Sequence, residues 1–219
     1  MLEDPSTDVA DVPPFDGSPG WRADRVLPDG GVVTIRGIVP EDREELRRGL
    51  AGLSPESRYF RFLHLGVSEP TEHLLTYLTA VDQKRHVALA ASVTSPDLKT
   101  DRGVGIARFV RLDGQPDTAE AAVTVVDDMH RRGIGTALLR ELLRAAELRG
   151  ITTLRAEVLA DNESMRTILE RAGAQKVAEE SGQGTIAYDL ALERVAPSSS
   201  SVFGVLRQAA EAMAERFRR

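Results

Sequence analysis

The stretch from Glu120 to Thr136 constrains the fold of this chain more than any other part of the sequence. It begins with small and β-branched residues, passes through an acidic turn and reaches two glycines that are one residue apart. Apolar residues then recur at helical spacing as far as Arg149, and Gly150 follows as a typical helix-ending residue. A strand that turns directly into an amphipathic helix indicates a domain of the α/β class.

The turn between this strand and helix has the features of an anion site. Amide groups at a helix N-terminus lack partners within the helix and carry partial positive charge, so they can bind a pyrophosphate. Gly133 and Gly135 would let phosphates approach closely, and Arg131 and Arg132 add mobile positive charge. Many tight strand-to-helix turns carry similar glycines without any ligand, so the glycines alone do not decide the matter.

The other patterns predict one α/β (α+β) domain with a mixed, mostly antiparallel central sheet of about six to seven strands flanked by helices. A chain of 219 residues is long enough for one main core. The expected order is a strand from Gly31, a helix from Pro40, one or two short helices over 54–78, strands at 86–93, 103–112 and 118–126, a helix at 134–149, a strand at 153–159, a helix at 162–172 and a hairpin over 175–192.

The two ends of the chain differ from this central domain. Residues 1–20 are acidic and proline-rich without apolar periodicity, which predicts a flexible arm ahead of a domain at 21–194. A serine-rich linker at 195–201 leads to an amphipathic helix at 202–219. For that helix we expect packing on its own domain or across a homodimer rather than membrane contact, because its polar face is only mildly basic.

Composition excludes several classes of function. Without cysteine the chain has no disulfides, thiolate metal sites or cysteine nucleophile, and its four scattered histidines give no reason to assign a metal. The net charge of −6, with no concentrated basic patch, argues against a nucleic-acid partner. No apolar run approaches the roughly 18 residues of a membrane span, and the start lacks a signal-peptide pattern, so we expect a cytoplasmic protein.

Two segments carry a resemblance to a known family. The run Arg-Arg-Gly-Ile-Gly-Thr-Ala-Leu-Leu at 131–139, with the later segment 162–174, resembles the coenzyme A-binding motifs of the GNAT acyltransferase superfamily. The resemblance covers about residues 31–192 and implies the GNAT fold and an acetyl-CoA-dependent N-acetyltransferase. Segment 53–62, together with Ala119-Glu120, is similar to bacterial protein lysine acetyltransferases that act on acyl-CoA synthetases. That similarity implies a protein lysine as acceptor.

The resemblance also implies roles for the residues around the glycines. The amides from Arg131 to Thr136 would hold the pyrophosphate, and the backbone from Val125 to Asp127 would pair with pantetheine. The Val125 amide would also polarise the thioester carbonyl. The implied acetyl-CoA-binding residues are Val125, Val126, Asp127, His130, Arg131, Arg132, Gly133, Ile134, Gly135, Thr136 and Asn162. His130 departs from the usual Gln or Arg and suits a turn or phosphate contact better than a catalytic base.

Glu120 is the candidate catalytic base. A lysine amine with a pKa of about 10.4 is protonated at neutral pH and must lose a proton before it attacks a thioester. The similar lysine acetyltransferases place their base glutamate at this spacing from the glycines, although an exposed strand-end glutamate is the alternative interpretation. Asp127 and Asp128 suit turn and helix-cap roles better.

Other assignments remain open at the level of sequence. Arg58, Tyr59 and Arg61 are candidate acceptor-site residues, or core and helix-cap residues. Leu169 stands where many family members place a tyrosine that protonates the leaving thiolate, and Tyr188 is the nearest candidate substitute. Acetylation of a small amine, or acyl-CoA binding as a sensor without turnover, are the alternatives to lysine acetylation.

Overall fold

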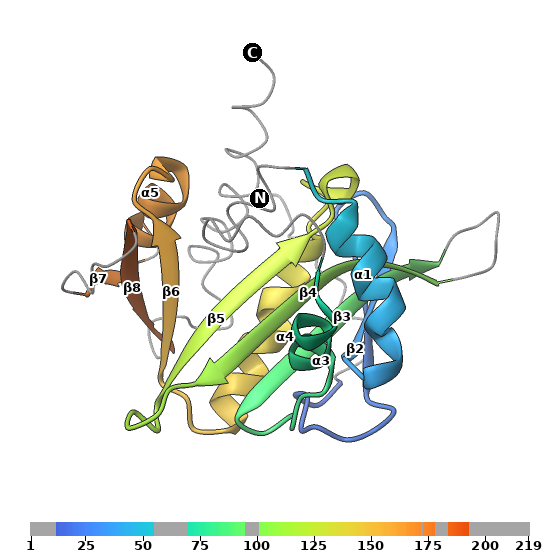
Figure 1. The fold of residues 1–219 in the computed structure, drawn as a ribbon, viewed down its shortest axis with the longest axis horizontal. Coiled ribbons are helices and arrows are strands. Elements are labelled where there is room, and N and C mark those ends of the chain that lie inside the picture. The colour runs from blue at the N-terminus through green and yellow to red at the C-terminus, as the bar shows by residue number, and fades with distance from the viewer. Residues whose placement is uncertain (1–11, 55–69, 95–100, 172, 178–183, 193–219) are drawn as a thin grey trace, which may run out of the picture.

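The computed structural model describes residues 12–54, 70–94, 101–171, 173–177 and 184–192. These residues form one mixed sheet of eight strands, in the order β1-β2-β3-β4-β5-β6-β8-β7, with helices on both faces (Figure 1). The predicted fold class is confirmed, with one strand more than the upper estimate. The additional strand is β1 (Arg22–Val26), which pairs antiparallel with β2 (Val32–Gly37) at the edge of the sheet.

Most elements lie where the sequence predicted them. The further strands are β3 (His86–Thr94), β4 (Asp101–Arg111), β5 (Thr118–Val125), β6 (Thr153–Leu159), β7 (Gln175–Lys176) and β8 (Thr185–Ala191). The helices are the 3-10 turn η1 (Pro40–Asp42), α1 (Arg43–Ala51), α3 (Glu72–Thr79), the 3-10 turn η2 (Asp127–Met129), α4 (Ile134–Leu148) and α5 (Glu163–Arg171).

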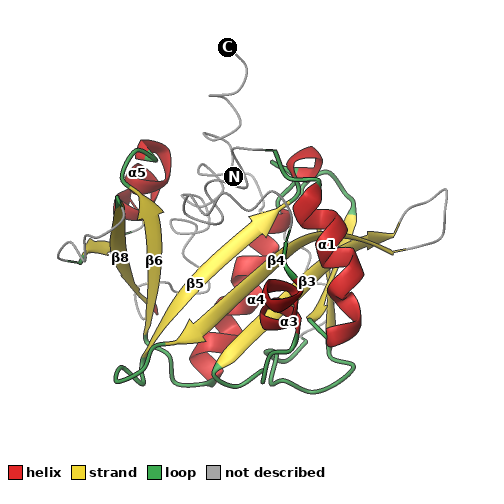
Figure 2. Cartoon of the chain, in the orientation of Figure 1, coloured by secondary structure: helices red, strands yellow, loops and turns green. Residues whose placement is uncertain are grey.

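Helices cover both faces of the sheet (Figure 2), and a hydrophobic core of unequal size lies on each face. The larger core packs α4 against β3, β4 and β5, and it buries Ile134, Leu138 and Leu142 because these residues share one helical face. The smaller core joins α1 and α3 through leucines such as Leu50 and Leu75. This second face is where α1 and α3 stand over the central strands.

The chain from Val12 onward packs against the domain rather than forming part of a free arm. Phe15 is only 1% exposed, and a Cβ on Gly37 would come within 2.8 Å of its ring, so the glycine makes room for it. Arg149 donates to the Phe15 carbonyl at 2.7 Å and lies 5.7 Å from the ring centroid. Residues 12–20, which the sequence grouped with the arm, therefore help to close the larger core.

Several expected segments fall outside the described residues, namely the first half of the arm, the helical segment 54–62 after its first residue, the linker and the C-terminal helix. Among the residues that the structure does describe, no helix is long and apolar enough to cross a membrane.

One feature of the sheet positions the candidate site. The strands β5 and β6 are parallel and pair only at Thr118↔Thr153, Ala119↔Leu154 and Glu120↔Arg155. Beyond that point β5 remains paired with β4, whereas β6 remains paired with β8. Strands β5 and β6 therefore separate toward their carboxyl ends (Figure 1). The sheet is therefore split, with the end of β5 on one arm and the end of β6 on the other.

Candidate active site

The N-terminus of α4 has the properties of an anion site. Gly133 is its N-cap in the left-handed conformation (φ 90°). The first backbone hydrogen bond of the helix is donated by Ala137 N–H to the Gly133 carbonyl at 2.9 Å. No described side chain caps the helix, and its first turn holds no acidic residue. The amides ahead of Ala137 therefore have no partner within this 15-residue helix and lie at its positive end.

The two glycines of this turn have different explanations. At Gly133 the φ is positive and a Cβ would lie 2.8 Å from Pro28 Cδ, so packing alone accounts for the glycine. Among the described atoms, a Cβ at Gly135 would meet only Val125 Cγ2, at 3.6 Å, which is an ordinary contact. The fold gives no reason for glycine at 135, whereas a phosphate held against the helix end would supply one.

Of the two arginines beside the glycines, one is tied to the fold. Arg132 Nε donates to Asp29 Oδ2 at 2.7 Å and Nη1 contacts the sulfur of Met129 at 3.2 Å. Its guanidinium is therefore held at the turn between β1 and β2, in contrast to the mobile charge that the sequence suggested. Arg131 is exposed and takes a left-handed backbone conformation (φ 64°).

The two aspartates of the turn have structural contacts. Asp128 forms a bidentate pair with Arg102 at 2.7 and 2.9 Å, and this hydrogen bonding lowers the pKa of the Asp128 carboxyl. Asp127 Oδ2 accepts from Ser54 N–H at 2.6 Å, which joins the turn to the end of the α1 region. These contacts fit the turn-forming roles that the sequence favoured for both residues.

The backbone at the end of β5 is directed partly into the split. Val126 N–H donates to Val104 and its carbonyl accepts from Met129, so Val126 is already used within the fold and is poorly placed to pair with pantetheine. Because amides alternate along an antiparallel strand, the Val125 N–H is directed to the other side, toward β6. His130 Nε2 lies 2.9 Å from the Val125 carbonyl, so this ring nitrogen must carry the proton.

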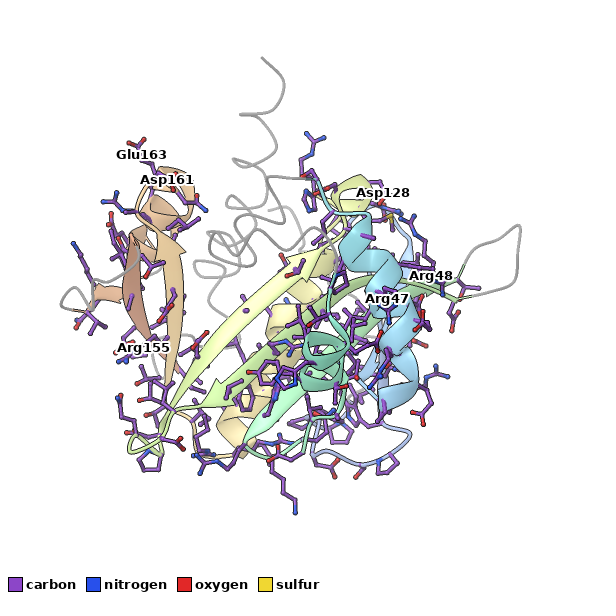
Figure 3. All side chains as sticks on the ribbon, viewed as in Figure 1. Arg47, Arg48, Asp128, Arg155, Asp161 and Glu163 are labelled. Carbon is purple, nitrogen blue, oxygen red and sulfur yellow. The ribbon has the colours of Figure 1, made fainter. Side chains whose placement is uncertain are left out.

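Asn162 stands on the opposite arm of the split. It directly precedes α5, follows the end of β6 and is 6% exposed, and its carbonyl accepts from Arg166 N–H at 3.1 Å. Its neighbours Asp161 and Glu163 are seen across the split from Asp128 (Figure 3). The structure therefore brings Asn162 and the glycine turn to the same end of the two strands.

Glu120 lies at the vertex of the split. It is the last residue of β5 in register with β6, and its side chain is exposed. Alternation along β5 places it on the same face as Ala122 and Thr124, which line a cavity under α1. The candidate base is therefore on the face of the sheet covered by α1 and α3, and away from the α4 core.

The cavity is lined mainly by apolar side chains, with a few charged ones. The charged lining includes a bidentate pair between Arg36 and Asp42, at 2.8 and 2.6 Å, Glu45, which accepts from Gly103 N–H, and Arg108. Such a cavity suits an aliphatic chain that ends in a polar group. The apolar side chains come from α1, α3 and the sheet, and include Leu46, Leu50, Leu53, Leu78, Ile106 and Ala122.

The remaining candidates are spread out. Arg58, Tyr59 and Arg61 lie outside the described residues. Leu169 is buried in the larger core. Tyr188 is fully buried on β8, and its hydroxyl donates to Glu170 of α5 at 2.9 Å, so it is held in the outer part of the sheet by a structural contact.

A buried cation beside the cavity was not predicted from the sequence. Arg108 on β4 is 5% exposed; it donates to the Leu78 carbonyl at 3.1 Å and contacts His86 Nε2 at 3.1 Å. Burial, and then the positive charge of Arg108, lower the pKa of His86 to about 4. The ring is therefore neutral at physiological pH and accepts from Arg108. In the sequence the pair is marked only by an arginine that stands between the apolar residues Ala107 and Phe109.

Comparisons with known proteins agree on one family. The model of the acetyltransferase (GNAT) domain matches residues 33–175. Acetyltransferase Pat of Mycolicibacterium smegmatis is 37% identical over 150 residues, which are 68% of this chain and 43% of that protein. Acetyltransferase PA5475 of Pseudomonas aeruginosa is 35% identical over 144 residues, which are 65% of this chain and 74% of that protein.

Solved structures support the same assignment. The GNAT domain of S. lividans PAT has a TM-score of 0.68 and 28% identity, over 80% of this chain and 99% of that chain. A cAMP-binding acyltransferase from Mycobacterium smegmatis has a TM-score of 0.52 and 28% identity, over 91% of this chain and 56% of that one. This chain therefore spans only about half the length of its mycobacterial relatives.

Proposed function

Because the chain belongs to the GNAT acetyltransferase family, we propose that it transfers the acetyl group of acetyl-CoA to a primary amine, and that the amine is a lysine side chain of a protein. The observation that carries the donor half is the N-terminus of α4. Its first amides have no partner within the helix, no described side chain caps it, and no described atom accounts for the glycine at 135. The names of the two relatives, both acetyltransferases, support acetyl as the group transferred.

We assign the donor contacts as follows. The amides from Arg131 to Thr136 hold the pyrophosphate, and Asn162 contacts the donor from the opposite arm of the split. The Val125 amide, directed toward β6, pairs with pantetheine or polarises the thioester carbonyl. Arg132 contributes less than Arg131, because its guanidinium is held by Asp29.

Glu120 acts as the general base on the acceptor. It takes one proton from the lysine ammonium, and the neutral amine attacks the thioester carbonyl to form a tetrahedral intermediate. The C–S bond then breaks, and the second amine proton ends on the coenzyme A thiolate directly or through water. Glu120 returns its proton to solvent, which its exposed position permits. No tyrosine is required, because a thiolate is a stable leaving group.

The cavity under α1 supports the acceptor half. It lies on the same face of β5 as Glu120, and its apolar side chains suit the methylene chain of a lysine. An acyl-CoA synthetase is the proposed source of that lysine, from the resemblance of segment 53–62.

Thiol release from acetyl-CoA tests the proposal, and since the chain has no cysteine it adds no background. Acceptors are small amines and an acyl-CoA synthetase, with modified lysines identified by mass spectrometry. We expect acetyl-lysine on the synthetase, and a loss of about 100-fold or more in kcat/KM for Glu120→Gln at neutral pH. Glu147→Gln, an exposed glutamate near the C-terminal end of α4 and away from the glycine turn, is the matched control and should retain activity.

Each other outcome contradicts one part of the proposal. Turnover with small amines alone would replace the lysine acceptor by a metabolite. Binding of acetyl-CoA without turnover of any acceptor would favour a sensor. Full activity of Glu120→Gln would remove Glu120 as the base.

A further inference from the structure

A row of three charged residues crosses the sheet where β5 and β6 separate. Glu120 on β5 is in register with Arg155 on β6, and Arg155 is in register with Asp189 on β8. Residues in register on neighbouring strands project from the same face, and their strands lie about 4.8 Å apart. Figure 3 shows Arg155 near the lower end of β6, close to this vertex. The candidate base therefore has a cation as its direct neighbour.

That cation is bound on the side away from Glu120. Arg155 Nε and Nη2 donate to the two carboxylate oxygens of Asp189 at 2.8 and 2.9 Å, the parallel geometry of a strong guanidinium–carboxylate pair. The side chains are 13% and 27% exposed, so solvent only partly weakens the pair. Because Asp189 is on β8, this bond holds the guanidinium toward β8 and away from β5.

A second cation on the other side of Glu120 is held in a similar way. Val110 is opposite Glu120 on β4, which places Arg108 diagonally from Glu120 on the same face. Arg108 contacts the Leu78 carbonyl and His86, on the side of α3 and β3. Among the described residues, the charged groups on this face of the two neighbouring strands are thus Arg108, Arg155 and Glu157, which is two residues from Arg155 on β6. His86 and Asp189 lie behind the two arginines.

The position of these cations matters for a base. A positive charge within about 4–6 Å of a carboxylate favours its ionised form and lowers its pKa by about one to three units. A carboxylate with a lower pKa accepts a proton from an ammonium less readily, so it is a weaker general base. An Arg155 side chain that turned toward Glu120 would therefore impair the proposed reaction.

We propose that Asp189 is a positioning residue for the base: by binding Arg155 it keeps the guanidinium from pairing with Glu120, and so maintains Glu120 as a proton acceptor. This inference rests on the proposed function, in which Glu120 is the base. Asp189 has no contact with substrate in this role and acts only through Arg155.

The direct test measures the titration of Glu120 itself. Protein labelled with ¹³C at glutamate carboxyl carbons is titrated by NMR, and Glu120→Gln identifies the Glu120 signal. Asp189→Asn keeps the shape of the side chain but removes its charge. In this variant we expect the pH midpoint of the Glu120 titration to fall by about one pH unit. Arg155→Gln combined with Asp189→Asn should return it to the wild-type position. An unmoved titration in Asp189→Asn overturns the proposal.

Kinetics provide the second readout. In Asp189→Asn the acid limb of the kcat/KM–pH profile should also move down by about one pH unit, with a plateau about three- to tenfold lower. A loss of thermal stability with an unmoved acid limb would show a merely structural role and overturn the inference. If Asp189→Asn does not fold, Arg155→Lys is the second variant, because it keeps the positive charge but cannot form the bidentate guanidinium pair with Asp189. It should lower the pH midpoint of the Glu120 titration, and an unchanged midpoint in this variant also overturns the proposal.

Failure of the proposed function would be recognised separately. If Glu120→Gln keeps full activity, Glu120 is not the base, whatever the NMR titration shows. If Glu120→Gln is inactive and the titration does not respond to Asp189→Asn, the base assignment stands and only the role of Asp189 is refuted.

Discussion

Replacing Gly135 with alanine should separate donor binding from stability. The added Cβ would lie 3.6 Å from Val125 Cγ2, an ordinary contact, so no atom of the described residues has to move. Glycine is less favourable than alanine in a helix by about 0.5–1 kcal/mol, which predicts a small gain in stability. For a chain of this size that gain corresponds to a rise in Tm of about 1–4 °C.

The same methyl group would stand where a phosphate has to approach the helix amides. Displacing the anion would weaken one or two hydrogen bonds to a charged group, each worth about 1.5–3 kcal/mol. The dissociation constant for acetyl-CoA should therefore rise at least about tenfold, since about 1.4 kcal/mol corresponds to a factor of ten.

Calorimetric titration with acetyl-CoA and thermal unfolding of the same preparation provide the two measurements. Gly49→Ala is the matched control, because Gly49 lies inside α1 and a Cβ there has no atom of the described residues within 4 Å. It should raise Tm by a similar amount and leave acetyl-CoA affinity unchanged. An acetyl-CoA affinity within twofold of wild type in Gly135→Ala would refute a phosphate site at this helix end.

Two further predictions concern stability. The folded-state pKa of His86, about 4, is below its unfolded value of 6.5, so the unfolded chain binds more protons between these pH values and the free energy of unfolding should fall as pH decreases from 6.5 to 4. The free energy of unfolding can fall by at most about 3 kcal/mol over this pH range, and solvent screening of the partly exposed ring reduces the expected fall to about 1–2 kcal/mol. In urea unfolding, the free energy of unfolding of His86→Gln should therefore vary with pH by that much less than the free energy of unfolding of the wild type. Arg25→Met should lower the free energy of unfolding by about 3 kcal/mol, because it removes two hydrogen bonds, at 2.9 and 2.7 Å, from the fully buried Glu141 carboxylate. Adding Glu141→Leu should restore most of this loss in urea unfolding, and an unchanged stability of the single variant would show that Arg144, 3.2 Å from the second oxygen, compensates fully.

Elements with strong local signals could be predicted from the sequence. The α4 helix carries apolar residues on one face and ends at a glycine, and the three central strands are β-branched runs separated by turn residues. These signals depend only on residues near one another in the chain, so the strand, turn and helix around Gly133 and Gly135 were predicted close to their actual bounds.

Elements that depend on distant partners could not be predicted in this way. Strand β1 turns Arg25 inward and leaves Val26 exposed, which is the reverse of a normal strand pattern. Arg25 can be buried only because Glu141, 116 residues later, supplies its charge partner. Phe15 likewise looked like part of an acidic arm, because the space beside Gly37 and the guanidinium of Arg149 that receive it are far away in the chain.

In the candidate site, too, some features follow from the local sequence and others only from the folded structure. The sequence by itself determined the helix N-terminus with its glycines and the presence of Glu120 on the preceding strand, because these are properties of one continuous segment. Only the tertiary structure decided that β5 and β6 separate just beyond Glu120, and that Arg155 and Asp189 continue the row from it. Strand register is set by long-range pairing and packing, so the electrostatic surroundings of the base are a property of the folded sheet.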